Sequence, residues 1–294
     1  MHTRRFLQRC RGKWIAAAVA ALFLSPQQGL SWGFWGHKFM TRKAVQLLPE
    51  ELRRAFVPLT ESLSAHSIDP DLWRKTDPKE GNRHYIDLEM FGAFPFAELP
   101  FEYEKAIKIF GEDSVQKAGI APWRIVEMMD SLSAAMRSKD RRLIVRYAAA
   151  LAHYVEDIHM PLHTTINYNG QYTGNDGIHS RYERWMLEMH KKEIRAALKP
   201  RPAVLLKDRL PTVFNWIFDS YVWVDNLLRA DTRARVPGKR YEEKDDFDRQ
   251  YYRRLFRETR SFTYLQMSRA TTAVASCWYT AWERAGRPTL NPLN

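Results

Sequence analysis

Histidines and carboxylates occur in this sequence at spacings that suit metal binding. His153 and Asp157 in AHYVEDIHMPLH lie four residues apart, as do His179 and Glu183 in GIHSRYERW. On a helix such residues project from one face, with Cβ atoms about 6 Å apart. A single pair at this spacing is also typical of two side chains that form a hydrogen bond or salt bridge with each other on a helix. The apolar run before His153 predicts burial, however, and buried ligand-type groups need partners such as a metal ion.

Further candidate ligands lie outside these two pairs. His163 follows Pro161, which we expect to end the preceding helix. His84 and Asp87 in RHYIDLE are spaced so that one could ligate while the other orients it, and SIDPDLWR supplies Asp71. Histidine and carboxylate ligands without cysteine are expected for catalytic rather than structural zinc. The sequence therefore predicts catalytic metal binding, and nothing in it points to a Ser-His-Asp triad.

The stretch SWGFWGHK places Trp32 and His37 directly after a segment that resembles an export signal. Residues 1–31 combine five basic residues, the apolar run WIAAAVAALFL, and Gly29 and Ser31 near the expected cleavage site. This apolar run is shorter than the ~20 residues that span a bilayer. We expect cleavage before Trp32, an exported protein that is periplasmic or secreted, and no membrane anchor afterwards. An uncleaved anchor is the alternative.

Composition fits one domain over residues 32–294 with an anionic partner. Residues 1–31 hold five basic and no acidic residues, so the net charge is +12 for the whole chain and +7 without them. A length of 263 residues suffices for one large core. The positive excess suits nucleic acid or phospholipid, or is simply a solvated basic surface. Cys277 is the only cysteine after residue 31, which excludes an intramolecular disulfide there.

Helical periodicity dominates the chain and predicts an all-α fold. Apolar residues recur at steps of three and four near residues 38–57, 122–138, 140–159, 179–198, 211–230 and 262–285. Alternating strand patterns are nearly absent. Residues 239–260 mix both charge signs densely, which predicts a solvated helical face with some disorder.

Five motifs then carry a resemblance to a known superfamily. They are W-G-x-x-G-H from Trp32, P-D-x-x-R from Pro70, H-Y-I-D from His84, H-x3-D-x5-H from His153 and H-x3-E from His179. In this order they resemble the trinuclear zinc superfamily of phospholipase C and single-strand-specific nucleases. The resemblance covers residues 32–183. It implies a multi-helix zinc phosphodiesterase with its metal site in a cleft between helices.

The resemblance also implies a role for each candidate residue, with three zinc ions in all. One ion would be held by Asp71, His84, His153 and Asp157. A second would share Asp157 and take His37 with the amino nitrogen and carbonyl oxygen of Trp32. A third would be held by His163, His179 and Glu183. Asp71 would orient or deprotonate the attacking water, and Arg74 would hold a phosphoryl oxygen. For Arg74 the alternative is an ion pair with Asp71 or Asp69.

The substrate is less clearly indicated. The short spacing from Trp32 to His37 resembles the nucleases, whereas Glu183 resembles the phospholipases, since nucleases typically have aspartate there. Tyr168, Tyr172 and Trp35 suit either stacked bases or lipid. We expect an anionic phosphodiester substrate, with phospholipase C activity on a phospholipid first. A single-strand nuclease or nucleotidase is the alternative, and a catalytically silent helical metal-binding protein is the third.

Overall fold

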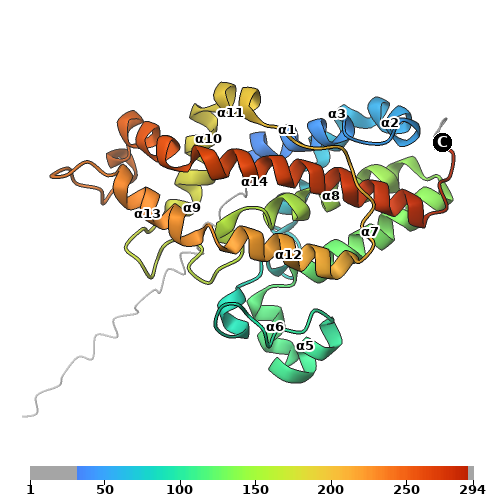
Figure 1. The fold of residues 1–294 in the computed structure, drawn as a ribbon, viewed down its shortest axis with the longest axis horizontal. Helices are drawn as coiled ribbons and strands as arrows, with labels where there is room; N and C mark the ends of the chain where they lie inside the picture. Colours follow the sequence, from blue (N-terminus) through green and yellow to red (C-terminus); the bar gives the residue numbers. More distant parts are fainter. Residues whose placement is uncertain (1–31, 291–294) are drawn as a thin grey trace, which may run out of the picture.

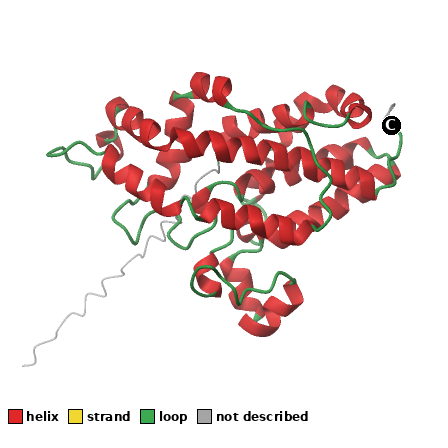
Figure 2. Ribbon diagram, viewed as in Figure 1, coloured by secondary structure: helices red, strands yellow, loops and turns green. Residues whose placement is uncertain are grey.

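Residues 32–290 are described by a computed structural model, and within them the chain forms helices and loops without a strand (Figures 1 and 2). The all-α prediction is confirmed. No helix in this part of the chain is long and apolar enough to cross a bilayer. The expected export signal, residues 1–31, lies outside the described residues, so its cleavage stays a prediction.

Three long helices form the centre of the bundle: α7 (Ala121–Ser138), α8 (Arg141–Asp157) and α14 (Arg249–Arg284). Helix α8 begins at Asp140, whose carboxylate accepts hydrogen bonds from the backbone N–H groups of Arg142 and Leu143. Its last ten residues, 148–157, are all buried. A helix that is covered on all sides belongs in a core, and it carries His153 and Asp157 into the interior.

The other helices surround this centre. Helices α1 (Gly33–Val45) and α3 (Thr60–His66) pack on α8, while α5 (Tyr103–Phe110) and α6 (Glu112–Ala118) lie away from the long helices in Figure 1. The remaining α-helices are α2 (Glu50–Phe56), α4 (Asp69–Trp73), α9 (Ile178–Ser180), α10 (Leu187–Met189), α11 (Lys191–Ala197), α12 (Arg209–Tyr221) and α13 (Val224–Ala234). Short 3-10 turns are η1 (Val57–Leu59), η2 (Gly81–Arg83), η3 (Leu88–Phe91), η4 (Pro161–His163) and η6 (Lys244–Asp246), and η5 (Arg181–Met186) is a π-helix.

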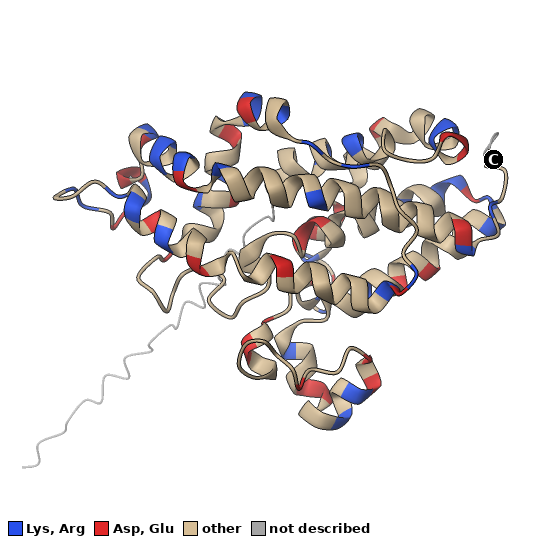
Figure 3. Ribbon diagram, in the orientation of Figure 1, with Lys and Arg blue, Asp and Glu red and all other residues tan. Residues whose placement is uncertain are grey.

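Helix α14 is longer than the periodicity predicted. We expected it to start near residue 262, but it starts at Arg249 and runs for 36 residues. The helix predicted within 239–260 is confirmed for its second half, but the prediction that this half is solvated and partly disordered is wrong. Tyr251, Leu255 and Thr259 are fully buried at steps of four. The arginines between these residues made the stripe hard to recognise in the sequence, and Arg253, Arg257 and Arg260 are exposed. Figure 3 shows basic positions along this part of the helix.

A row of hydroxyls on α14 holds an extended segment, residues 199–206. The backbone N–H groups of Lys199, Arg201, Val204 and Leu206 donate to the side-chain oxygens of Ser268, Thr272, Ser276 and Thr280, at 2.9–3.1 Å. These hydroxyls recur every four residues, so they form one line along the helix. The segment thus obtains from side chains the bonds that a strand would obtain from a neighbouring strand.

Candidate metal centre

Three groups of buried histidines and carboxylates lie close enough to hold metal ions. They are His37, His153 and Asp157; Asp71, His84 and His153; and His163, His179 and Glu183. Within each group the candidate ligand atoms lie within 4.8 Å of one another. All eight side chains that the sequence singled out as ligands therefore come together, and two groups share His153. Asp87 of the H-Y-I-D motif joins none of them.

Many elements contribute to these groups. Helix α1 carries His37, α4 carries Asp71, and α8 carries both His153 and Asp157. The remaining ligand candidates come from short turns: His84 follows η2, His163 ends η4, His179 lies on α9 and Glu183 on η5. The site is thus built where the C-terminal end of a buried helix meets several irregular segments.

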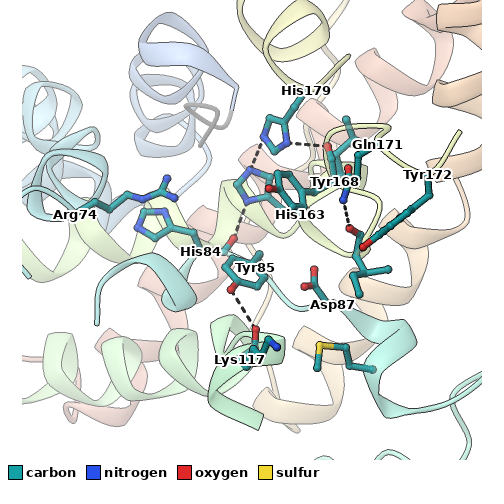
Figure 4. A pocket seen from close by; sticks show the side chains of 13 residues that line it. Arg74, His84, Tyr85, Asp87, Lys117, His163, Tyr168, Gln171, Tyr172 and His179 are labelled. Atoms are coloured by element: carbon teal, nitrogen blue, oxygen red, sulfur yellow. Dashed lines mark hydrogen bonds between the residues drawn. The ribbon is translucent and has the colours of Figure 1, made fainter. Parts of the chain in front are cut away.

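Backbone carbonyls orient three of the histidines. The Nδ1 atoms of His153, His163 and His179 lie 2.7–2.9 Å from the carbonyl oxygens of Ser67, His84 and Tyr168. In the tautomer that donates this bond, Nε2 is left with a free lone pair and faces the cluster. In His163 and His179 the two Nε2 atoms are 3.2 Å apart (Figure 4). Fixing a ring through its second nitrogen is how metal ligands are generally held.

Glu156 orients His37, a role that sequence reasoning missed. Its carboxylate lies 2.5 Å from His37 Nδ1, and it accepts a hydrogen bond of 3.1 Å from Thr41. The backbone carbonyl of Glu156 accepts the indole N–H of Trp32 at 2.7 Å. Complete burial raises the pKa of Glu156 well above its usual value. The only signal was an acidic residue inside an apolar run, beside Asp157.

Glu80 is a second buried carboxylate that the sequence did not reveal. Its Oε1 lies 3.4 Å from His84 Nε2 and accepts the hydroxyl of Tyr154, while Oε2 lies 2.5 Å from Arg83. Burial alone would raise the pKa of Glu80, but hydrogen bonds from His84, Tyr154 and Arg83 lower it to about 2. A charged carboxylate therefore supports His84 from the side away from Asp157.

The buried donors and acceptors of this centre fit zinc. Among the described residues, several of its buried atoms lack a hydrogen-bond partner: His37 Nε2, Asp71 Oδ1 and Oδ2, Asp157 Oδ1, and both carboxylate oxygens of Glu183. A buried polar atom without a partner is destabilising by about 1–3 kcal/mol. Imidazole nitrogens and carboxylate oxygens around one point are zinc ligands. Cations bound at the three groups would provide partners for these atoms.

Trp32 lies at the first turn of α1, and its indole is fully buried against Tyr182. Its carbonyl oxygen accepts a hydrogen bond of 3.1 Å from the N–H of Gly36. A Cβ at position 36 would lie 2.8 Å from the Cβ of Trp32, so only glycine fits this close turn. The indole of Trp32 and the imidazole of His37 both contact Glu156. Whether the backbone of Trp32 binds a metal stays a prediction.

Arg74 faces the centre and also pairs with Asp71. Its Nη1 lies 3.7 Å from Asp71 Oδ1, whereas Asp69 pairs with His66 at 2.8 Å. The ion pair that we kept as an alternative is therefore present, with Asp71. Burial raises the pKa of Asp71, although His153 and His84 oppose this. Because Arg74 also lines the adjoining pocket, the ion pair and a contact with substrate are compatible.

A pocket of about 460 Å³ opens beside the histidines. Figure 4 shows Tyr168 beside His163 and His179, with Gln171 and Tyr172 farther to the right and His84 to the left. Asp87, Tyr85 and Lys117 also line it. Burial, with Glu89 nearby, raises the pKa of Asp87 to about 7. Of the three aromatics that the sequence proposed for stacking, Tyr168 and Tyr172 lie here, and Trp35 does not.

A buried ion pair holds the π-helix that carries Glu183. Arg181 donates to Asp231 Oδ1 at 2.9 Å and to Tyr251 at 3.0 Å, and its guanidinium lies 4.0 Å from the ring centre of Phe247. Asp231, Phe247 and Tyr251 all come after the segment that the sequence motifs cover. The C-terminal part of the chain thus fixes the turn between His179 and Glu183.

Comparison with known proteins adds one finding. The model of the S1/P1 nuclease family matches residues 32–193, which is more than half of the chain. The match includes every candidate ligand in the three groups. No curated protein matches the chain.

Proposed function

We propose that this chain, which belongs to the S1/P1 nuclease family, hydrolyses single-stranded nucleic acid or nucleotides. Membership shows a zinc-dependent phosphodiester hydrolase. The observation that carries the finer proposal is that the matching family is one of nucleases. It favours the alternative in our sequence interpretation over phospholipase C activity.

The pocket beside the metal centre supports a nucleotide as the substrate. Tyr85, Tyr168 and Tyr172 offer aromatic surface on which a base can stack. Asp87 and Lys117 offer polar groups that could bond the edge of a base. A volume of about 460 Å³ lies within the usual range for small-molecule sites. Arg74, at the same pocket, suits the phosphate.

In phosphodiester hydrolysis the zinc ligands, Asp71 and Arg74 would each have a different role. Zinc held by the three groups would lower the pKa of a bound water and stabilise negative charge on the phosphate. Asp71 has two carboxylate oxygens without hydrogen-bond partners among the described residues, so it can accept a proton or orient the attacking water. Arg74 would bind a non-bridging oxygen as its charge grows. The buried histidines keep their orientation because their other nitrogens are bonded.

A side-by-side hydrolysis assay tests this proposal. Zinc-loaded protein beginning at Trp32 would be given dT25 and phosphatidylcholine vesicles at equal phosphodiester concentration. We expect hydrolysis of dT25, and a fall in kcat of about 10²–10⁴-fold in Asp71→Asn, the range for loss of a general acid or base. Asp69→Asn is the matched control, because Asp69 contacts His66 instead. Faster hydrolysis of the vesicles would refute the nuclease proposal.

Export and cleavage before Trp32 are also part of the proposal. A free α-amino group has a pKa of about 7.7–8.0, so it can ligate zinc near neutral pH, and Trp32 and His37 both contact Glu156. A protein with an added Met before Trp32 should therefore bind less zinc and lose most of its activity. The bound zinc would be measured by atomic absorption. Equal zinc content and activity in both forms would contradict a role for the terminus.

A further inference from the structure

Trp35 lies in a second groove, on the outer side of α1. The groove has a volume of about 410 Å³ and is lined by Trp35, Phe39, Arg42, Lys43, Gln46 and Arg195. We call it the α1–α11 groove. The rings of Trp35 and Phe39 are stacked, with centres 5.2 Å apart and planes 9° apart. Both rings are half-buried, so each keeps part of its surface open to the groove.

Positive charge surrounds these two rings. The guanidinium of Arg195 lies 5.7 Å from the ring centre of Trp35 and 5.8 Å from that of Phe39. Arg42 is balanced by Glu61, at 2.6 Å. By contrast, no ion pair with a described residue engages Lys43 or Arg195. The groove therefore combines flat aromatic surface with at least two cations whose charge is not neutralised.

The α1–α11 groove is separate from the metal centre but shares a helix with it. His37 lies between Trp35 and Phe39 in the sequence and is completely buried in the metal centre. Residues two apart on a helix point to nearly opposite sides. The metal pocket and the groove have no lining residue in common. Figure 1 shows α1 and α11 together on one side of the long helix α14.

We propose that the α1–α11 groove binds a segment of single-stranded nucleic acid away from the bond that is cut. The bases would stack on the ring surface of Trp35 and Phe39, and the phosphates would contact Lys43 and Arg195. Stacking on aromatics beside cations is how single strands are bound without sequence preference. This inference rests on the proposed function, and it selects single strands rather than isolated nucleotides as the substrate.

A polyanion fits this groove better than a lipid surface does. Membrane-binding faces present large apolar side chains outwards, with their apolar area inserted in the lipid. Here the two rings are recessed among charged side chains and only partly exposed. Recessed rings beside unbalanced cations match a chain that carries one phosphate per flat base.

The test compares long and short substrates in variants of the groove. Arg195→Glu reverses one groove charge, and Lys192→Glu is the control, because Lys192 is exposed on the same helix and does not line the groove. For dT25 we expect KM to rise about tenfold in Arg195→Glu, comparable to losing one stacked base. For the dinucleotide dT2, kcat and KM should stay within about twofold, and the slope of log KM against log salt for dT25 should fall by about 1. Lys192→Glu should change none of these.

Phe39→Ala provides a second variant that leaves the charges unchanged, and it should raise KM for dT25 but not for dT2. Equal KM values for dT25 in Arg195→Glu and Lys192→Glu would overturn the proposal. So would Arg195→Glu weakening the binding of anionic phospholipid vesicles while dT25 is unaffected. If wild-type protein cleaves neither dT25 nor dT2, the proposed function fails. The affinity of uncleaved dT25, measured by fluorescence anisotropy, still decides whether the groove binds strands.

Discussion

At the scale of single residues, the ligand candidates were visible in the sequence and their supports were not. His153 with Asp157, and His179 with Glu183, are recognisable because both members of each pair lie within one turn of chain. Glu156 contacts His37, which is 119 residues away in the sequence. Glu80 contacts Tyr154 across 74 residues. Only packing of distant segments creates such contacts, so no local spacing could indicate them.

Glu156 provides a prediction at this scale. Glu156→Met keeps the length of the side chain but removes both oxygens, and with them the acceptor for His37 Nδ1. Loss of such a support typically weakens metal binding about 10–100-fold, and we expect this for zinc, measured by competition with a chromophoric chelator. Thr41→Val removes only the bond to the other carboxylate oxygen, so its effect should be smaller. Unchanged zinc affinity in Glu156→Met would show that His37 does not depend on this contact.

At the scale of elements, periodicity predicted the long helices well, but it did not predict where a helical region is interrupted. Helices α7 and α8 begin and end within two residues of the predicted bounds, because each has one continuous apolar face. The region 179–198 reads as one helix in sequence but forms α9, the π-helix η5, α10 and α11. The buried ion pair between Arg181 and Asp231 lies where the π-helix interrupts the predicted single helix. Asp231 lies far along the chain, so a local pattern cannot include it.

The hydroxyl row on α14 allows a graded prediction about stability. Thr280→Val leaves the buried N–H of Leu206 without its acceptor, which should lower the free energy of unfolding by about 1–3 kcal/mol. Thr272→Val removes the equivalent bond to Arg201 at an exposed position, where water replaces it, so the loss should be well under 1 kcal/mol. Both losses in the free energy of unfolding would be measured by urea unfolding, with one m value shared by the variants. Equal losses of stability in the two variants would mean that burial does not determine how much each of these hydrogen bonds contributes.

At the scale of the whole molecule, the metal centre joins segments that are distant in sequence. Its candidate ligands run from residue 37 to residue 183 and come from α1, α4, α8, η4, α9, the π-helix η5 and the residue that follows η2. Without a cation several buried atoms of these groups lack hydrogen-bond partners among the described residues, which opposes folding. A ligand that binds only the folded form stabilises it by about 2.7 kcal/mol at 100 times its dissociation constant. Zinc should therefore act as a part of the fold as well as a catalyst.

The labelling rate of the Cys277 thiol can measure how far zinc stabilises the fold, without an activity assay. It is fully buried in the hydrophobic core formed with α7 and α8, and burial raises the pKa of its thiol. A raised pKa means less thiolate at pH 8, so a thiol reagent should react very slowly with the zinc-loaded protein beginning at Trp32. Chelation of zinc should lower Tm and increase the labelling rate about tenfold or more, because opening becomes easier by over 1.4 kcal/mol. The variant Cys277→Ser serves as the blank for labelling. Equal rates with and without zinc would show that the core around α8 keeps its stability without the metal.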